Sequence, residues 1–230
     1  MDVREALYTT RAMRRVTSEP IPLDAQLRIL DAAVRAPSGG NAQNWRFLLV
    51  DSPEVKAAIA PIYKRAIDGL WTGYYKDRID AAHADPESAE SKSMLAVQKS
   101  AQWLADHFEQ VPLYLFGFST DPGGSSIYPA MWSAQLAARA EGIGSSLTQA
   151  LAFYNDETLE ILGVPKDGGW YMAGALSFGY PTGRWGVAAR QPAREVTFRN
   201  RWGEPAGFVD DGPLWPSGDG KSMTLPSSGS

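Results

Sequence analysis

The sequence predicts a three-layer sandwich, with helices on both sides of a mixed β-sheet. Amphipathic segments of helical length alternate with a few short apolar runs along the chain, a pattern typical of helices packed on a central sheet. One run, residues 111–118, is apolar almost without interruption, which is typical of a strand covered on both faces. A chain of 230 residues is long enough for one domain with a sizeable core.

The first half of the chain alternates helical and extended patterns. Leu23, Leu27, Leu30 and Val34 recur at helical spacing, and this helix should end before Pro37. The polar segment 80–92 is expected to be irregular or solvated, whereas the residues from 94 to 108 place their apolar side chains on one helical face. Helices are therefore predicted over residues 2–9, 23–34, 53–75 and 94–108, and strands over residues 46–50 and 111–118.

The second half continues the same alternation. Residues 120–126 form a loop rich in Gly and Ser. The segment 128–140 is helical and rich in alanine, which allows close packing and predicts a central helix. Strands are expected over residues 145–151 and 171–178, and a helix over 156–162. The tail from residue 203 to residue 230 is loop-like and contains four prolines.

Composition excludes several classes of protein. The net charge of −4 and the isoelectric point near 5.3 argue against nucleic acid as a partner. The chain has no cysteine, which excludes disulfides and thiolate chemistry and fits a reducing cytoplasm. No apolar run approaches the roughly 20 residues that span a bilayer, so we expect no membrane partner. The two histidines, His83 and His107, lack metal-ligand spacing, and we predict no metal site.

Two short segments carry the chemistry. The loop Ala36-Pro-Ser-Gly-Gly-Asn-Ala-Gln-Asn-Trp45 brings donors and acceptors together with glycines that permit close backbone approach. Arg11, Arg14 and Arg15 lie upstream of it, and clustered guanidinium groups suit the binding of a phosphate. Taken alone, the loop is as readily a polar turn, and a lone arginine cluster is more often solvated surface charge.

Together these segments resemble the N-terminal signature of the FMN-dependent nitroreductase family. The resemblance rests on Thr10-Arg-Ala-Met-Arg-Arg15, on Glu19-Pro-Ile-Pro22 and on the run from Ala32 to Phe47, in this order and spacing. At the other end, Gly179-Tyr-Pro181, Arg190-Gln-Pro192 and the segment from Val196 to Trp202 resemble the closing segment of the family. The resemblance covers roughly residues 2–202. It implies an FMN-binding domain over residues 1–202, a C-terminal extension over 203–230, a mostly antiparallel sheet and an obligate homodimer.

The resemblance also implies which residues meet the flavin. Arg11, Arg15 and Arg190 match the basic residues at its phosphate and ribityl oxygens, and the glycine loop is expected to serve the flavin of the other subunit. Ala12 and Met13 depart from the polar residues usual there, so that only the backbone of Met13 can serve the flavin. The complete predicted cofactor-binding set is Arg11, Ala12, Met13, Arg15, Pro37, Ser38, Gly39, Asn41, Gln43, Leu147, Thr148 and Arg190.

The expected activity is hydride transfer from NAD(P)H through FMN to nitroaromatic, quinone or related small-molecule acceptors, by a ping-pong mechanism. No side chain of the protein is expected to be catalytic, because the flavin carries the chemistry. Two alternatives remain open: a protein that sequesters FMN under a lid built from residues 70–92, and a specialised oxidase or dehydrogenase of a biosynthetic pathway. Oxidation of NAD(P)H with a quinone separates the first alternative from the expected enzyme.

Overall fold

The structure is a computed structural model, and it describes all residues except 122, 209–213 and 216–230. The chain divides into two compact units. The larger unit comprises residues Arg11–Arg184, and the smaller comprises Met1–Thr10 together with Trp185–Ser230. Most of the predicted C-terminal extension lies outside the described residues.

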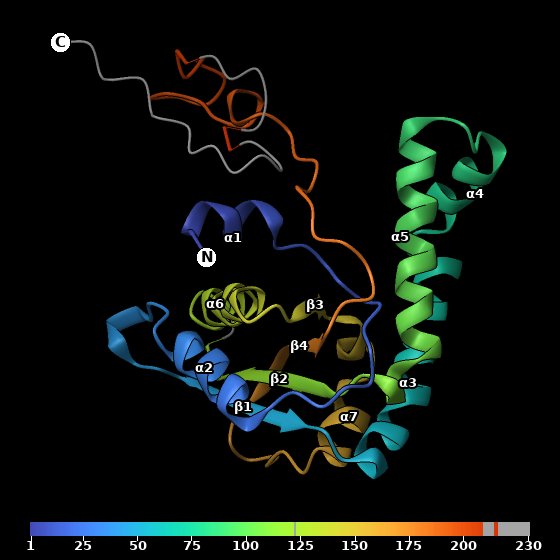
Figure 1. The fold of residues 1–230 in the computed structure, drawn as a ribbon, viewed down its shortest axis with the longest axis vertical. Helices are drawn as coiled ribbons and strands as arrows, with labels where there is room; N and C mark the ends of the chain where they lie inside the picture. Colours follow the sequence, from blue (N-terminus) through green and yellow to red (C-terminus); the bar gives the residue numbers. More distant parts are fainter. Residues whose placement is uncertain (122, 209–213, 216–230) are drawn as a thin grey trace. The chain divides into compact units, whose positions relative to one another are not determined.

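A four-stranded sheet forms the centre of the larger unit (Figure 1). The strands are β1 (Trp45–Val50), β2 (Leu113–Ser119), β3 (Gly144–Thr148) and β4 (Tyr171–Gly179), in the order β1-β2-β4-β3. Neighbouring strands are antiparallel throughout. Among the described residues, the isolated bridge between Ala12 and Ser145 is the one parallel pairing. The predicted mostly antiparallel sheet is confirmed.

Helices cover both faces of this sheet. On one face, α2 (Leu23–Val34) and α6 (Ile127–Ala140) pack together with Leu113 and Leu115 of β2. On the other face, α3 (Pro53–Thr72), α5 (Ala89–Asp106) and α7 (Asn155–Ile161) lie with Tyr114 and Phe116 of the same strand. Because side chains alternate along a strand, β2 feeds both cores and all seven of its residues are buried. The predicted three-layer sandwich is therefore confirmed.

The residues that helix α2 buries do not include its first two leucines. Ala25, Ile29 and Ala33 are the residues packed into the core. Leu23 is 80% exposed and Leu27 is 68% exposed. The periodicity that predicts the helix thus includes residues of two faces, and one of these faces is apolar and open in the single chain.

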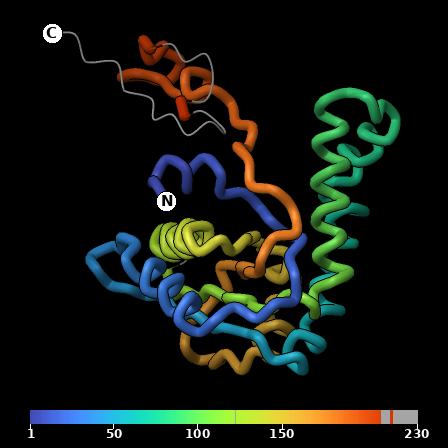
Figure 2. The backbone as a smooth tube through the Cα atoms, in the orientation of Figure 1, coloured from blue at the N-terminus to red at the C-terminus, as the bar shows by residue number. Residues whose placement is uncertain are grey.

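The segment 80–92 is mostly exposed, as expected of a solvated segment, but it is largely helical rather than irregular. Helix α4 (Lys76–Ala84) and the first turn of α5 occupy most of it. The side chain of Ser88 accepts a hydrogen bond from the backbone N–H of Ser91 and so caps α5. Ile79, Ala82 and Met94 form a small separate core between the two helices. In Figure 2 the chain reverses direction between α4 and α5, and we call these two helices the α4–α5 hairpin.

The smaller unit contains α1 (Val3–Thr9) and the described part of the C-terminal segment. The rings of Tyr8 and Trp215 lie 5.9 Å apart, and the hydroxyl of Tyr8 accepts a hydrogen bond from the backbone N–H of Leu214 at 3.1 Å. These contacts join α1 to the C-terminal segment within one unit. Short 3-10 helices occur at Gly39–Asn41, Phe108–Gln110, Ala150–Tyr154 and Ala193–Glu195.

Candidate active site

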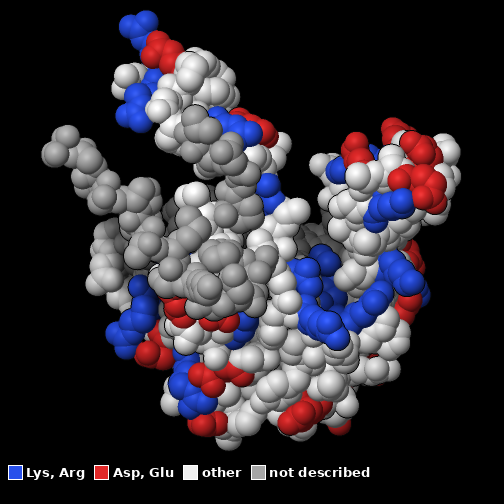
Figure 3. Space-filling view, turned by 45° about the horizontal axis from the view of Figure 1, so that its top comes forward, with Lys and Arg blue, Asp and Glu red and all other residues white. Residues whose placement is uncertain are grey.

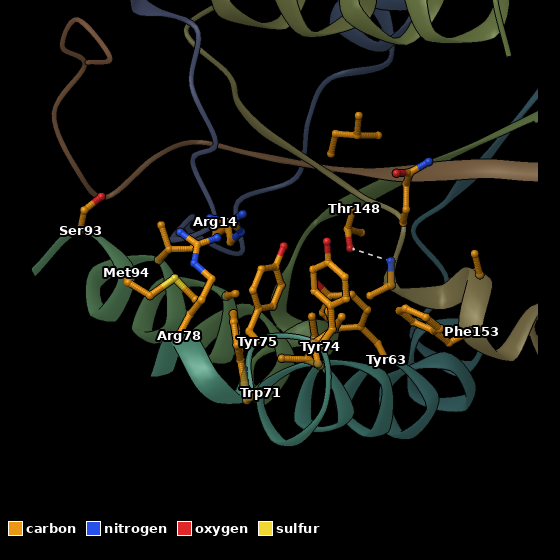
Figure 4. A pocket seen from close by; sticks show the side chains of 18 of the residues that line it. Arg14, Tyr63, Trp71, Tyr74, Tyr75, Arg78, Ser93, Met94, Thr148 and Phe153 are labelled. Carbon is orange, nitrogen blue, oxygen red and sulfur yellow. Dashed lines mark hydrogen bonds between the residues drawn. The ribbon is translucent and has the colours of Figure 1, made fainter. Parts of the chain in front are cut away.

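A cavity of about 860 Å³ lies in the larger unit, and its walls come from α3, the α4–α5 hairpin and the segment that follows β3. Figure 4 shows side chains from these elements pointing into it. Most of the lining is aromatic or aliphatic, with a few charged and polar groups among it. The lining residues used below are Arg14, Tyr63, Trp71, Tyr74, Tyr75, Arg78, Glu90, Met94, Val97, Leu147 and Thr148.

Three polar residues of the lining, Arg14, Tyr63 and Thr148, interact through a hydrogen bond between Tyr63 and Thr148 and through the charge of Arg14 near Tyr63. Tyr63 is only 1% exposed, and burial raises the pKa of its hydroxyl despite a hydrogen bond with Thr148 and the nearby charge of Arg14. Burial also lowers the pKa of the Arg14 guanidinium. No hydrogen bond or ion pair of the Arg14 side chain occurs among the described residues. A desolvated cation without a partner is costly and is stabilised by an anion.

The helix side of the cavity is aromatic. Trp71 is held by a hydrogen bond from its indole N–H to the side-chain oxygen of Gln102, at 3.1 Å. The Tyr74 ring meets the edge of the Tyr75 ring, with 4.8 Å between centroids, and Trp71 lies 5.6 Å from Tyr75. Trp71 and Tyr75 also pack on the core of the α4–α5 hairpin. The position of this hairpin therefore fixes the aromatic wall.

The N-terminal arginines lie in a segment that runs along the edge of the sheet. Its anchor is the backbone N–H of Met13, which donates to the carbonyl of Ser145 at 2.8 Å. The Met13 side chain is buried, and within the described part of the chain its carbonyl accepts no backbone hydrogen bond. Arg11 donates to the carbonyl of Arg184 at 2.8 Å, and the carbonyl of Arg15 accepts from Thr182.

The predicted cofactor residues thus fall into separate places. Leu147 and Thr148 line the cavity. Arg11, Ala12 and Arg15 are exposed, and they do not line it. The predicted set omits the arginine of this segment that does line the cavity, Arg14. Its place in the arginine cluster gives a signal for an anion site, but no pattern in the sequence indicates which arginine turns inward.

The glycine loop is exposed and conformationally strained. Its predicted residues, Pro37, Ser38, Gly39, Asn41 and Gln43, lie at the surface or partly exposed, outside the cavity. Asn41 and Gln43 adopt positive φ values of 55° and 50°, which non-glycine residues rarely do. The Ser38 hydroxyl accepts from the N–H of Gln43 at 3.2 Å and closes the loop. Such strain in an exposed loop is typical of functional sites.

Arg190 belongs to the smaller unit, where its guanidinium donates to the carbonyl of Ala189 at 2.8 Å. Its role at the flavin phosphate stays a prediction. Within the described residues, no group of three or more His, Cys, Asp or Glu side chains is placed to hold a metal ion. None of the helices in the described part of the chain has the length and apolarity to cross a membrane.

The chain belongs to the nitroreductase family, whose sequence model matches residues 7–180. This match includes the arginine segment, the glycine loop and every residue that lines the cavity. The NADH dehydrogenase of Thermus thermophilus is 39% identical to the chain over 59 residues, which are 26% of this chain and 29% of that protein. That NADH dehydrogenase is one of three curated relatives of which the chain matches only 20–30% of the length.

Solved structures share the fold over nearly the whole chain. The FMN- and NADPH-dependent nitroreductase NfnB from sphigopyxis sp. strain HMH superposes with a TM-score of 0.64 at 22% identity and covers 88% of this chain and 100% of that one. Oxidised iodotyrosine deiodinase, solved with FMN and 3-iodo-L-tyrosine, gives a TM-score of 0.62 at 24% identity and covers 84% of this chain and 95% of that one. At these identities, the likeness establishes the fold.

Proposed function

We propose that the protein is an FMN-dependent oxidoreductase that passes hydride from NAD(P)H to a small organic acceptor, such as a nitroaromatic or a quinone, in a ping-pong cycle. The observation that carries this proposal is the cavity of about 860 Å³ beside the arginine segment of a nitroreductase-family chain. Cofactor pockets usually measure about 300–1,000 Å³ and are mostly apolar, with a few placed polar groups. Of the two solved structures named above, one is an FMN-dependent enzyme and the other holds FMN.

The chain offers groups that a flavin mononucleotide could use. Leu147 and Thr148 come from the end of β3 and would meet the ring. Arg11 and Arg15 would hold the anionic end, because guanidinium groups bind phosphate through paired hydrogen bonds. Arg190 would add a third contact, and the glycine loop with Pro37, Ser38, Gly39, Asn41 and Gln43 would reach the flavin of a second subunit. When bound, FMN supplies the hydride chemistry, and the protein supplies position and electrostatics.

Assembly into a homodimer is part of the same proposal. Leu23 and Leu27 form an exposed apolar stripe on α2, the helix that leads into the glycine loop. A contiguous exposed apolar surface is typical of a protein interface. A second copy on this face would cover the leucines and place the loop of each chain near the other. Interfaces of obligate dimers often bury more than about 2,000 Å².

The visible spectrum of the purified protein tests the flavin proposal. We expect a yellow protein with about one FMN per chain, whose colour bleaches when NADH or NADPH is added without oxygen and returns when a quinone is added. A colourless protein that does not bind added FMN would overturn the proposal. Bleaching by dithionite but by neither nicotinamide would overturn the NAD(P)H step and leave the flavin assignment intact.

The α4–α5 hairpin supports a second candidate function, a flavin-sequestering protein. Trp71 and Tyr75 connect the hairpin to the cavity wall, so movement of these helices would change access to the flavin. A sequestering protein would hold FMN tightly and oxidise NAD(P)H only slowly, even with excess quinone. Steady turnover with a quinone favours the oxidoreductase.

A further inference from the structure

Two arginines in the cavity have no anionic partner within the described part of the chain. Arg14 is partly buried, and Arg78 is an exposed residue of α4 that also lines the cavity. Among the described residues, neither makes an ion pair, although other cations of the same unit do. Lys76, two positions before Arg78, pairs with Asp80. Helix α4 thus carries one cation that is paired and does not line the cavity, and one that lines the cavity without an acidic partner among the described residues.

Both guanidinium groups lie at the same end of the cavity. Figure 4 shows the side chains of Arg14 and Arg78 at this end, beside Tyr75 and Met94. The guanidinium carbon of Arg78 lies 6.0 Å from the centre of the Tyr75 ring. In the space-filling view, Lys and Arg side chains gather at the hollow beside α5 (Figure 3). Glu90 is the one carboxylate among the described lining residues, so positive charge prevails there.

The rest of this region is suited to a flat apolar body. Trp71, Tyr74 and Tyr75 present rings, and Met94 and Val97 add aliphatic surface. Aromatic rings pack well on other aromatic rings in offset or edge arrangements. A guanidinium group binds a carboxylate or a phosphate through paired, charge-assisted hydrogen bonds. A ligand that combines a ring with an anion would satisfy both parts of the lining at once.

We propose that the cavity selects an aromatic acceptor that carries an anionic group, with Arg14 and Arg78 pairing with the anion while the aromatic wall holds the ring. This inference rests on the proposed function, because it treats this part of the cavity as the acceptor space of a flavin enzyme. The anion is a carboxylate or a phosphate ester, since both accept paired hydrogen bonds from a guanidinium. Arg14 and Arg78 are then specificity residues, and the flavin remains the reacting group.

The test compares the binding of two aromatic anions with the binding of their neutral counterparts, in the absence of turnover. The FMN-loaded protein is titrated by calorimetry with 4-hydroxybenzoate and 4-hydroxybenzamide, and phenyl phosphate is compared with phenol. We expect each anion to bind at least about tenfold more tightly than its neutral partner, as charge-assisted hydrogen bonds allow. A larger preference for phenyl phosphate than for the benzoate would assign the site to phosphate esters. Equal affinity within both pairs would overturn the proposal.

The variants Arg78→Met and Arg14→Met locate the effect. Each should reduce the preference for the anion by about tenfold or more, while affinity for the amide changes little. Lys76→Met is the matched control, because it removes the same charge from α4 outside the cavity, and it should keep the preference. Arg78 is exposed on α4, so its variant should fold even if Arg14→Met does not. An equal loss in Lys76→Met would show a general charge effect and overturn the assignment.

The same variants distinguish an acceptor site from a cofactor site. If Arg14 and Arg78 hold the phosphate of the flavin instead, their replacement will weaken FMN binding but not riboflavin binding, and this result would overturn the acceptor assignment. The titrations require no hydride transfer. If the protein binds the anions more tightly than their neutral partners but does not oxidise NAD(P)H, the proposed function would be refuted and the anion site would be supported.

Discussion

The backbone N–H of Met13 donates to the carbonyl of Ser145 at 2.8 Å, and this bond fixes the arginine segment along β3. Two and three residues further along the same strand, Leu147 and Thr148 line the cavity. Together with the bonds from Thr182 to Arg15 and from Arg11 to Arg184, this bond holds the arginines beside the cavity wall. It also explains how Arg14 reaches Tyr63, which stands on helix α3. The role of this segment is structural as well as electrostatic.

We expect Arg11→Ala to weaken FMN binding by about tenfold or more, because hydrogen bonds to charged groups contribute roughly 1.5–3 kcal/mol. Arg190→Ala should act in the same direction, with a smaller loss if Arg184 compensates. Fluorescence titration of the flavin-free protein measures both effects. Riboflavin is the control, since it lacks the phosphate, and its affinity should change little. An equal loss of riboflavin and FMN would show that these arginines are structural.

The sequence predicts the layers of this fold well because burial patterns are local. Residues 111–118 indicate a strand covered on both faces, and β2 is buried throughout. The hairpin is not predictable in the same way, since α4 has a weak apolar face and depends on tertiary contacts around Ile79. Likewise, the place of the arginine segment depends on contacts such as the bond between Met13 and Ser145, two residues far apart in the chain, and no local pattern indicates such contacts.

Gly144 should not tolerate a side chain. A Cβ atom at this position would lie 2.8 Å from the Cβ of Met13, which cannot move without shifting the backbone of the arginine segment. We expect Gly144→Ala to lower the free energy of unfolding by about 1–3 kcal/mol, as overpacking does, and to weaken FMN binding as well. Urea denaturation measures the first effect, and fluorescence titration with FMN measures the second.

Gly69→Ala in α3 is the control for that variant. Apart from the neighbouring backbone of its own helix, no described atom lies within 4 Å of a Cβ at Gly69, so alanine should stabilise this helical position by about 0.5–1 kcal/mol. If Gly144→Ala were as stable as the wild-type protein, the prediction would be contradicted. The arginine segment would then not be held tightly at Gly144.

Tyr114 should contribute to unfolding in alkali. Its hydroxyl donates to the carbonyl of Phe108 at 2.9 Å, and burial raises its pKa well above 10.0. The unfolded chain therefore loses this proton at lower pH than the folded one. The resulting stability is present below about pH 10 and is lost as pH rises above it, toward the folded pKa.

The variant Tyr114→Phe tests this linkage. At pH 7 it should cost about 0.5–1.5 kcal/mol for the lost hydrogen bond, and the Phe108 carbonyl keeps the N–H of Val111 as a donor at 3.3 Å. Above pH 10 its stability should fall less steeply than that of the wild-type protein in urea titrations. Tyr74→Phe, at a side chain that is 80% exposed, should leave the slope unchanged. Parallel slopes for Tyr114→Phe and wild type would refute the assignment.

The open leucine stripe of α2 should hold the dimer together. Leu27→Glu places a charge where we expect apolar contact between subunits, and desolvating an unpaired carboxylate is costly. We expect sedimentation velocity to show a dimer for the wild-type protein and mostly monomer for the variant at low micromolar concentration. Because the glycine loop would contact the flavin of the partner subunit, the monomer should also bind FMN less tightly.

Tyr74→Glu is the control, because it places the same charge at an exposed residue of the cavity wall, away from α2. This variant should remain a dimer. A Leu27→Glu protein that stays dimeric with full flavin affinity would place the interface elsewhere.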